Sequence, residues 1–344
     1  MAPKVAIIIL NWNGWPDTIE CLESISKVNY PNLDVIVLDN ASSDGSPQKI
    51  IDWCRQTGVL CEESFQRYPY VRIEPLSQID YERKGIRRLR LIRLSSNIGF
   101  CAGNNIGMTQ AAANGSEYFL ILNNDTIVSP DSLEAMITAA QQENNVGLVG
   151  CIICYADEPN TIWFSGGVFD KWLESSRRLN GQDITNVVFE EVFDTHWVSG
   201  CAMLIPRRVY EEIGGFDEDF FIWSEEWDYS LRVKEAGYRL IVSGHSIINH
   251  KVGHSLGVMQ PLSYYYGTRN RLLLKRKHLP LSRKLSFLLF FLFSRIPRFI
   301  LFALQGRWDL IQCGCAAIRD YFVGRTGKWA AHDEWFERQE IRPD

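Results

Sequence analysis

The amino-acid sequence predicts an α/β fold with a mainly parallel central sheet. Short apolar runs rich in β-branched residues recur along the first half of the chain, and segments with helical spacing separate them. Strands that are buried on both faces give such continuous runs, and strand–helix alternation is typical of parallel sheets. The length of 344 residues is enough for a sizeable core in one large domain or two modest ones.

The elements follow one another in a regular order. The runs VAIIIL and LDVIVLD predict the first two strands, at Val5–Leu10 and Leu33–Asp39, and Thr18–Ser26 between them has helical spacing. The stretch from about 54 to 88 is polar and follows neither period, so we expect an irregular insertion there. The later predicted elements are strands at Leu89–Leu94, Tyr118–Leu122, Val146–Ile153 and His196–Pro206, and a short capped helix at Ser224–Ala236.

The nine cysteines indicate buried thiols in a reducing compartment. They are odd in number, scattered, and mostly embedded in apolar runs, which does not resemble a disulfide framework. Cys151 and Cys154 form a CxxC within a predicted buried strand, and no second ligand pair lies at zinc spacing, so we interpret both as structural. The N-terminal MAPKVAIII lacks the three regions of a secretory signal in series.

The charge is distributed unevenly along the chain. The formal net charge is −5, yet the 236–308 segment has no acidic residue and twelve Lys or Arg. A basic region after an acidic body predicts an anionic partner for that region. The basic residues flank an apolar run and are not interleaved with stacking aromatics, which argues against nucleic acid.

Polar and glycine-rich segments follow four consecutive predicted strands. Because the carboxyl ends of parallel strands meet at one edge of a sheet, these segments predict a ligand site. Each segment alone is equally explained as a turn, since Asp and Asn side chains cap their own backbone. The segments are NWNG after the first strand, NASSDGS after Asp39, SSNIGFCAGNNIG at Ser95–Gly107, and Asn123-Asn124-Asp125.

Taken together, these segments resemble the family 2 inverting glycosyltransferases, and are most similar to the rhamnosyltransferase-like branch. The series also includes HWVSGCAMLIPR, GGFDEDFFIWSEEWDYSLR and NHKVGHS, and covers roughly Val5 to Lys277 in order. The resemblance implies a GT-A type nucleotide-binding domain over residues 1–258. Residues 259–344 would then form a basic and apolar helical region that associates with the membrane.

The resemblance also implies roles for particular residues. Trp12 would stack on the base of the donor, and Asp39 would accept from its pyrimidine N–H. The NND triplet stands where the family has its DxD signature, so Asp125 would bind Mg²⁺ or Mn²⁺ together with His250, for which His254 is the competitor. The other implied nucleotide-binding residues are Asn97, Gly103, Asn104, Asn105, Asn123 and Asn124.

An acid pair is implied as the catalytic machinery. Inversion needs a base to remove the proton of the acceptor hydroxyl, and Glu226 aligns with the family's base, with Glu225 as a supporting acid. Ser224 is expected to be the N-cap, which places both acids in the first helical turn. The alternative is that they only complement the helix dipole. Asp228 is explained by a helical salt bridge to Arg232, four residues later.

The C-terminal region predicts membrane association. The polybasic segment Tyr264–His278 precedes an apolar run at Phe287–Leu304, which Arg295, Pro297 and Arg298 interrupt. We expect helices on the inner face of the cell membrane, held by apolar burial and contacts to anionic lipid. A soluble helical pair packed on the catalytic domain is the alternative. Arg269 is expected to contact the donor diphosphate, or else a lipid headgroup.

The predicted function is therefore cytoplasmic transfer of a sugar from a dTDP- or UDP-linked donor to a hydroxyl of a lipid-linked or glycan acceptor. Rhamnose is the expected sugar from branch resemblance alone, in surface-polysaccharide synthesis. A non-catalytic, membrane-associated scaffold that binds sugar nucleotides is the alternative. A sugar-nucleotide pyrophosphorylase is disfavoured, because NWNGWPD is unlike the Gly-rich loop with Arg and Lys that follows the first strand in those enzymes.

Overall fold

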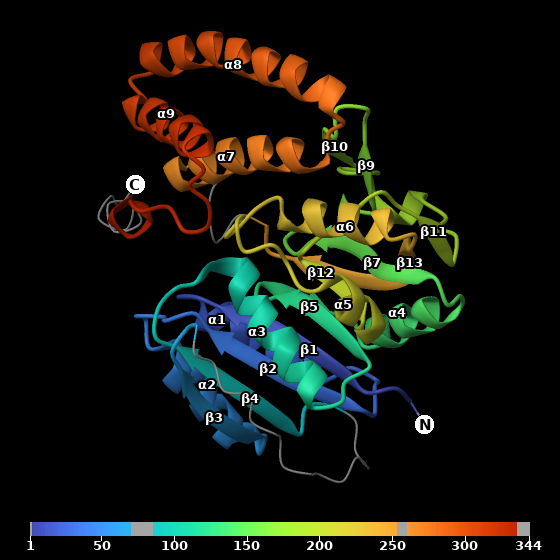
Figure 1. Cartoon of the computed structure of the whole chain (residues 1–344). Coiled ribbons are helices and arrows are strands. Elements are labelled where there is room, and N and C mark those ends of the chain that lie inside the picture. Colours follow the sequence, from blue (N-terminus) through green and yellow to red (C-terminus); the bar gives the residue numbers. More distant parts are fainter. Residues whose placement is uncertain (1, 70–84, 253–259, 336–344) are drawn as a thin grey trace.

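The computed structural model describes residues 2–69, 85–252 and 260–335. Strands and helices alternate through the first half of the chain (Figure 1). The elements of this half are β1 (Val5–Asn11), α1 (Trp15–Ile25), β2 (Leu33–Asp39), α2 (Ser46–Thr57), β3 (Leu60–Gln66), β4 (Arg88–Leu94), α3 (Gly99–Ala113), β5 (Tyr118–Asn123), β6 (Thr126–Val128), α4 (Ser132–Gln141) and β7 (Val146–Tyr155).

The second half contributes shorter strands and then three long helices. Its elements are β8 (Ile162–Phe164), β9 (Gly167–Phe169), β10 (Ser175–Arg177), the 3-10 turn η1 (Ile184–Asn186), β11 (Val192–Asp194), β12 (Ala202–Pro206), α5 (Arg207–Ile213), α6 (Glu225–Glu235), β13 (Arg239–His250), α7 (Pro261–His278), α8 (Leu281–Leu304) and α9 (Trp308–Phe322).

The central sheet is mainly parallel, as predicted. Within the described residues its main path runs β11-β13-β7-β12-β5-β1-β2-β4-β3. The pairs β1–β2, β1–β5, β2–β4, β3–β4 and β7–β13 are parallel, whereas β12 lies antiparallel to β5 and β7. The parallel register sets Asn11 opposite Asp39 and Leu10 opposite Asn123. The polar segments after these strands therefore begin at one edge of the sheet.

Helices cover both faces of the sheet, which explains the continuous apolar strands. Ile7 and Ile9 of β1 contribute to the core that α1, α2 and α4 cover, and Ile8 contributes to the core beneath α3, α5 and α6. All three side chains are fully buried. The CxxC pair is buried in β7 as expected, and the cysteines of the described residues are all free thiols.

The predicted irregular insertion over 54–88 is wrong at both ends. Helix α2 extends to Thr57, and Leu60–Gln66 forms an edge strand parallel to β4, which begins at Arg88. β3 escaped the sequence pattern because it is an edge strand whose residues are mostly exposed or partly exposed. Such a strand needs no continuous apolar run. The part of the predicted insertion at 70–84 lies outside the described residues.

The last three helices stack beside the sheet, with α8 outermost (Figure 1). Helix α7 packs its Leu273 and Leu274 into the core beneath α6, and also contacts α9. Helix α8 exposes most of its apolar side chains, including Phe290 and Phe293 at 68% each. By length and composition, α8 is the one helix of the described residues that could cross a membrane.

Three of the five Lys and Arg residues of α7 form ion pairs within the protein, contrary to the expectation that this segment faces lipid. Arg271 and Lys275 form ion pairs with Glu174, at 2.7 and 3.1 Å. Lys277 pairs with Asp217. Both carboxylates belong to the acidic body of the chain. Part of the charge asymmetry is therefore satisfied internally, which composition alone could not distinguish from an external anionic partner.

Candidate active site

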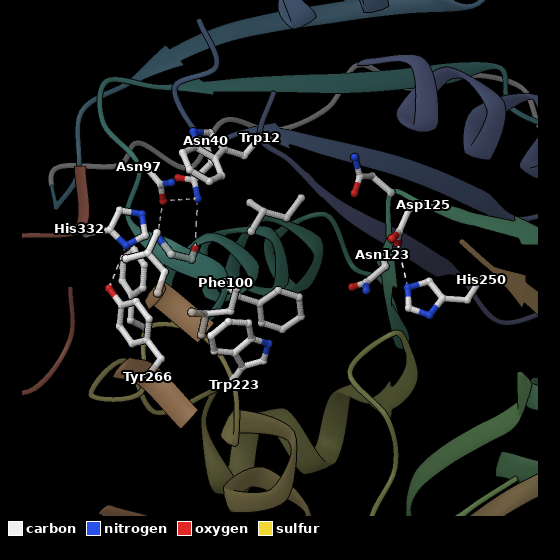
Figure 2. Close-up of a pocket in the computed structure, with 16 residues that line it drawn as sticks. Trp12, Asn40, Asn97, Phe100, Asn123, Asp125, Trp223, His250, Tyr266 and His332 are labelled. Atoms are coloured by element: carbon white, nitrogen blue, oxygen red, sulfur yellow. Dashed lines mark hydrogen bonds and ion pairs between the residues drawn. The ribbon is translucent and has the colours of Figure 1, made fainter. Parts of the chain in front are cut away.

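A pocket of about 280 Å³ opens at the carboxyl ends of β1, β2, β4 and β5. Its volume is close to the lower end of the range for small-ligand sites. Two groups of polar side chains lie at opposite ends, and aromatic rings lie between them (Figure 2). The lining residues are Leu10, Trp12, Asn40, Asn97, Gly99, Phe100, Asn123, Asn124, Asp125, Phe221, Ile222, Trp223, His250, Leu262, Tyr266 and His332.

One end of the pocket is built by Trp12, Asn40 and Asn97. The Asn40 amide donates to Asn97 Oδ1 over 3.0 Å, and Asn40 Oδ1 accepts from the backbone N–H of Ile98. These bonds join the loop after β2 to the loop after β4. Trp12 and Asn97 were predicted for the nucleotide site, and both line the pocket.

Asp39 is buried beside the pocket and does not line it. Its Oδ1 accepts from the Asn11 side chain over 2.7 Å, and its Oδ2 accepts from the backbone N–H of Ser42 over 3.1 Å. These bonds hold together the loops after β1 and β2. The predicted contact of Asp39 with the donor base stays a prediction.

The three residues predicted on α3, Gly103, Asn104 and Asn105, do not line the pocket. A Cβ at Gly103 would lie 2.5 Å from the Leu10 side chain, so this glycine permits close packing of α3 on β1. Asn104 donates to the Phe100 carbonyl within the helix. Asn105 donates to the Phe216 carbonyl over 2.9 Å and accepts from the Phe216 N–H over 2.8 Å. These residues are contiguous with Asn97 in the SSNIGFCAGNNIG segment, but they lie within α3. Successive residues of a helix face different directions, so these three contribute to packing and Asn97 lines the pocket.

The other end of the pocket brings Asp125 and His250 together. Asp125 Oδ1 lies 3.1 Å from His250 Nε2, although 125 residues separate them. The edge of the Trp163 ring packs against the imidazole at 5.0 Å between centroids. Asn123 and Asn124 also line the pocket, and the Asn124 amide donates to Thr18 Oγ1. The competitor His254 lies outside the described residues.

The Asp125–His250 pair fits a divalent cation. Despite their short separation the two groups are not aligned for a hydrogen bond, and within the described residues Asp125 Oδ1 and His250 Nδ1 have no hydrogen-bond partner. Adjacent ligands of an octahedral ion at about 2.1 Å are about 3 Å apart. The described residues contain no group of three or more His, Cys, Asp or Glu that could hold a metal, so remaining ligands would come from elsewhere.

Glu225 and Glu226 begin α6. They directly follow Ser224 and the pocket-lining Trp223. The prediction that both acids occupy the first turn is confirmed. Ser224 stands at the N-cap position but makes no side-chain capping bond, because its backbone is left-handed with φ of 72°. The predicted salt bridge from Asp228 to Arg232 is present at 2.8 Å.

Neither Glu225 nor Glu226 lines the pocket, but the stem of Glu226 lies near one of its walls. A Cβ at Gly200 would lie 3.6 Å from both Glu226 Cβ and the ring of the pocket-lining Phe100. Burial, and next the charge of Glu226, raise the pKa of Glu225 well above its ordinary value. Burial raises the pKa of Glu226 to about 7, against the lowering effect of a hydrogen bond from Glu225. Glu225 therefore keeps its proton while Glu226 ionises near neutral pH.

Arg269 is buried and does not line the pocket, although its guanidinium lies over the ring of the pocket-lining Tyr266, 5.1 Å from the centroid. Its guanidinium donates to the carbonyls of Gly327, Asp219 and Phe220, at 2.7, 3.2 and 3.2 Å. This geometry does not support the predicted diphosphate contact, because the N–H groups of the guanidinium already donate to these backbone carbonyls. The neighbouring Asn270 donates to the carbonyls of Phe220, Ile222 and Trp223.

Sequence reasoning missed several residues of the pocket. Asn40 begins the NASSDGS segment directly after Asp39, and Tyr266 lies in the polybasic segment Tyr264–His278. Their positions in these segments were therefore an available signal. His332 follows every motif and gave no signal. The missed lining residues are Leu10, Asn40, Gly99, Phe100, Phe221, Ile222, Trp223, Leu262, Tyr266 and His332.

The sheet and the pocket at its carboxyl edge define an α/β protein with a candidate ligand site. Residues 3–261 match the profile of the family described as glycosyltransferase like family 2. The chain belongs to this family, and it is a glycosyltransferase.

Individual relatives are distant in sequence. The chain is 22% identical over 283 residues to the N-acetylglucosaminyl-diphospho-decaprenol L-rhamnosyltransferase of Mycobacterium tuberculosis, covering 75% of this chain and 79% of the relative. The structure of the mannosyltransferase PcManGT of Pyrobaculum calidifontis with GDP-Man and Mn²⁺ matches with a TM-score of 0.53 and 18% identity, covering 99% of this chain and 81% of that one.

A third match is the structure of GalNAc-T7 with UDP, GalNAc and Mn²⁺. Its TM-score is 0.54 at 14% identity, covering 72% of this chain and 43% of that longer chain. At these identities the structural matches establish the fold alone, which is of the GT-A type.

Proposed function

We propose that this glycosyltransferase transfers a sugar from a nucleoside diphosphate donor to a hydroxyl of a lipid-linked glycan, with inversion at the anomeric carbon. The observation that carries the proposal is the arrangement of the pocket. A carboxylate and an imidazole suited to a cation stand at one end, and Glu226 lies near the wall that Phe100 forms. Rhamnose from a dTDP- or UDP-linked donor is the proposed sugar, because the relative from M. tuberculosis is named as an L-rhamnosyltransferase.

One end of the pocket binds the nucleoside of the donor, and the other end binds its diphosphate. The ring of Trp12 and the amides of Asn40 and Asn97 provide stacking and hydrogen bonding for the nucleoside. Asp125 and His250 would hold Mg²⁺ or Mn²⁺ at the diphosphate. When bound, such a cation stabilises the negative charge that develops on the leaving diphosphate oxygens.

Glu226 acts as the general base in the proposed reaction. Its carboxylate takes the proton of the acceptor hydroxyl while that oxygen attacks the anomeric carbon, and the carbon–oxygen bond to the nucleoside diphosphate breaks. A base is most effective when its pKa lies near the working pH, and burial raises the pKa of Glu226 to about 7. Glu225 keeps a proton and donates toward Glu226, which orients the base.

The membrane-associating surface is proposed to be the outer face of α8. Its exposed apolar side chains are contiguous, whereas those of ordinary soluble surfaces are scattered singly. Arg283, Lys284 and Arg298 on the same helix suit anionic lipid. We place the enzyme peripherally on the inner face of the cell membrane, where it would meet a lipid-linked acceptor. The exposed apolar residues are Leu281, Leu285, Leu289, Phe290, Phe293, Ile296, Ile300, Leu301 and Leu304.

The proposed division is a catalytic domain at 1–258 and a helical region at 259–344, with the boundary outside the described residues.

A panel of donors tests the proposed function. The purified full chain in detergent, with Mg²⁺ or Mn²⁺, is offered UDP-, dTDP- and GDP-linked sugars, and release of nucleoside diphosphate is measured with and without chelator. We expect metal-dependent consumption of one donor. A folded protein that binds and consumes none of them would contradict the proposal and favour a scaffold that lacks catalysis.

A further inference from the structure

The segment that follows α9 returns to the pocket, although the family profile ends at residue 261. Gly327 anchors it twice, since its N–H donates to the Asp219 carbonyl over 2.8 Å and its carbonyl accepts from Arg269 over 2.7 Å. The Trp329 ring stacks on Tyr265 with 4.1 Å between centroids and 12° between planes. These contacts bring His332 to the pocket wall.

The hydrogen bonds around Tyr266 assign the proton on His332. The Tyr266 hydroxyl accepts from the backbone N–H of Trp329 over 3.0 Å and lies 3.1 Å from His332 Nδ1. Burial lowers the pKa of His332 to about 4, so the ring is neutral at pH 7 and only one of its nitrogens carries a proton. Within the described residues the Tyr266 hydroxyl proton has no other acceptor, so the hydroxyl donates it to Nδ1. The ring proton is then on Nε2.

Among the described residues, no acceptor faces the Nε2–H of His332. His332 is 5% exposed, and its Nε2 has no hydrogen-bond partner in the part of the chain that the structure describes. A buried donor without an acceptor is unfavourable unless a ligand supplies one. The rings of Phe221 and Trp12 border the imidazole, with centroids 5.2 and 6.0 Å away, and they restrict its rotation.

The position of His332 indicates which part of the ligand it meets. In Figure 2 the ring lies with Trp12, Asn40 and Asn97 at one end of the pocket, while Asp125 and His250 lie at the other. The first end is the one proposed for the nucleoside. Ligand acceptors there are the carbonyl oxygens of a pyrimidine base, the oxygens of the nucleoside sugar and the nearer phosphate oxygens.

We infer that His332 is a donor-binding residue, whose Nε2–H donates to an acceptor oxygen of the nucleotide in the sugar donor. The inference rests on the proposed function and adds to it a residue from outside the family domain. The C-terminal segment is thus one wall of the donor site.

Two variants separate the hydrogen bond from packing. His332→Phe keeps an aromatic ring beside Trp12 and Phe221 but removes the N–H, and His332→Ala removes both. Binding of UDP and dTDP to the full chain with Mg²⁺ is measured by calorimetry, and thermal unfolding checks that each variant is folded. His245→Ala is the control, because His245 is exposed and does not line the pocket.

We expect both His332 variants to weaken nucleotide binding about tenfold, with the control unchanged. Comparison with uridine and thymidine then locates the acceptor: the same loss with the nucleosides assigns it to the base or sugar, and a loss confined to the diphosphates assigns it to phosphate. A folded His332→Phe that binds like wild type would overturn the inference and leave the proposed function intact. Failure of wild type itself to bind any nucleotide would overturn both.

Discussion

The side-chain amide of Asn270 donates to the backbone carbonyl of Trp223 over 2.9 Å, three residues before Glu226. The same amide also meets the carbonyls of Phe220 and Ile222, at 2.8 and 2.7 Å. Left-handed backbone is costly for residues other than glycine, yet this loop has φ of 66° at Trp223 and 72° at Ser224. One side chain of α7 therefore stabilises a strained loop that ends at the acid pair.

The first prediction concerns Asn270. In Asn270→Asp the side chain still accepts from Arg269 but can no longer donate to the loop. We expect a fall in kcat of at least about tenfold and a loss of about 3 kcal/mol in unfolding free energy, since three buried carbonyls lose a donor. Steady-state kinetics and urea unfolding measure both. A variant with the wild-type kcat would show that catalysis does not depend on the hydrogen bonds from Asn270 to this loop.

The second prediction concerns the base. Glu226→Gln removes the proton acceptor with little change in shape, so we expect transfer to fall by at least about 100-fold while the Kd for nucleotide stays within about twofold. Glu134→Gln on the exposed face of α4 is the matched control. Transfer at the wild-type rate by Glu226→Gln would rule out this residue as the base.

The third prediction is a pH profile. Glu226 must be ionised to accept a proton, and burial raises its pKa to about 7. We therefore expect kcat/KM to fall about tenfold for each pH unit below 7 and to level off above it. In Glu225→Gln the neutral amide still donates a hydrogen bond in place of the protonated acid, so we expect most of the activity to remain. A flat profile from pH 5 to 8 would be incompatible with this assignment.

The fourth prediction concerns Asp125 and His250. Asp125→Asn removes the one carboxylate of the proposed cation site, and His250→Ala removes the imidazole beside it. We expect each variant to need at least about tenfold more Mn²⁺ for half-maximal donor hydrolysis, because fewer protein ligands hold the ion. Asp157→Asn, at an exposed position, is the control. Unchanged Mn²⁺ titrations for both variants would place the cation elsewhere.

The fifth prediction concerns the outer face of α8. Replacing Phe290, Phe293 and Ile296 together by Ser removes apolar surface that is more than half exposed and leaves the buried side of the helix intact. We expect the bound fraction to fall several-fold in sedimentation with vesicles that contain anionic lipid. Val188→Ser is the control, because it changes a still more exposed apolar residue in a different part of the fold. Equal sedimentation of the triple variant and wild type would exclude α8 as the lipid contact.

The sequence was sufficient for most of the buried strands of the first half of the chain, but it gave no prediction for the mostly buried β13, and β12 begins at Ala202, six residues after the predicted start at His196. β1 and β2 were predicted to within one residue, because burial on both faces demands an unbroken apolar run. The start of α6 at Glu225 was also predictable, since acids in the first turn are a local signal. β3 was missed because its exposed residues carry no such pattern.

Local pattern thus determined the strands, the order of the polar loops at their ends and the family, since each depends on residues close together in the chain. The tertiary structure alone decided which side chains share the pocket. It set His250 against Asp125, turned Arg269 inward to the carbonyl of Gly327, and brought His332 beside Trp12. Such contacts join residues 58 or more positions apart, so they depend on the path of the chain and on packing that no local period encodes.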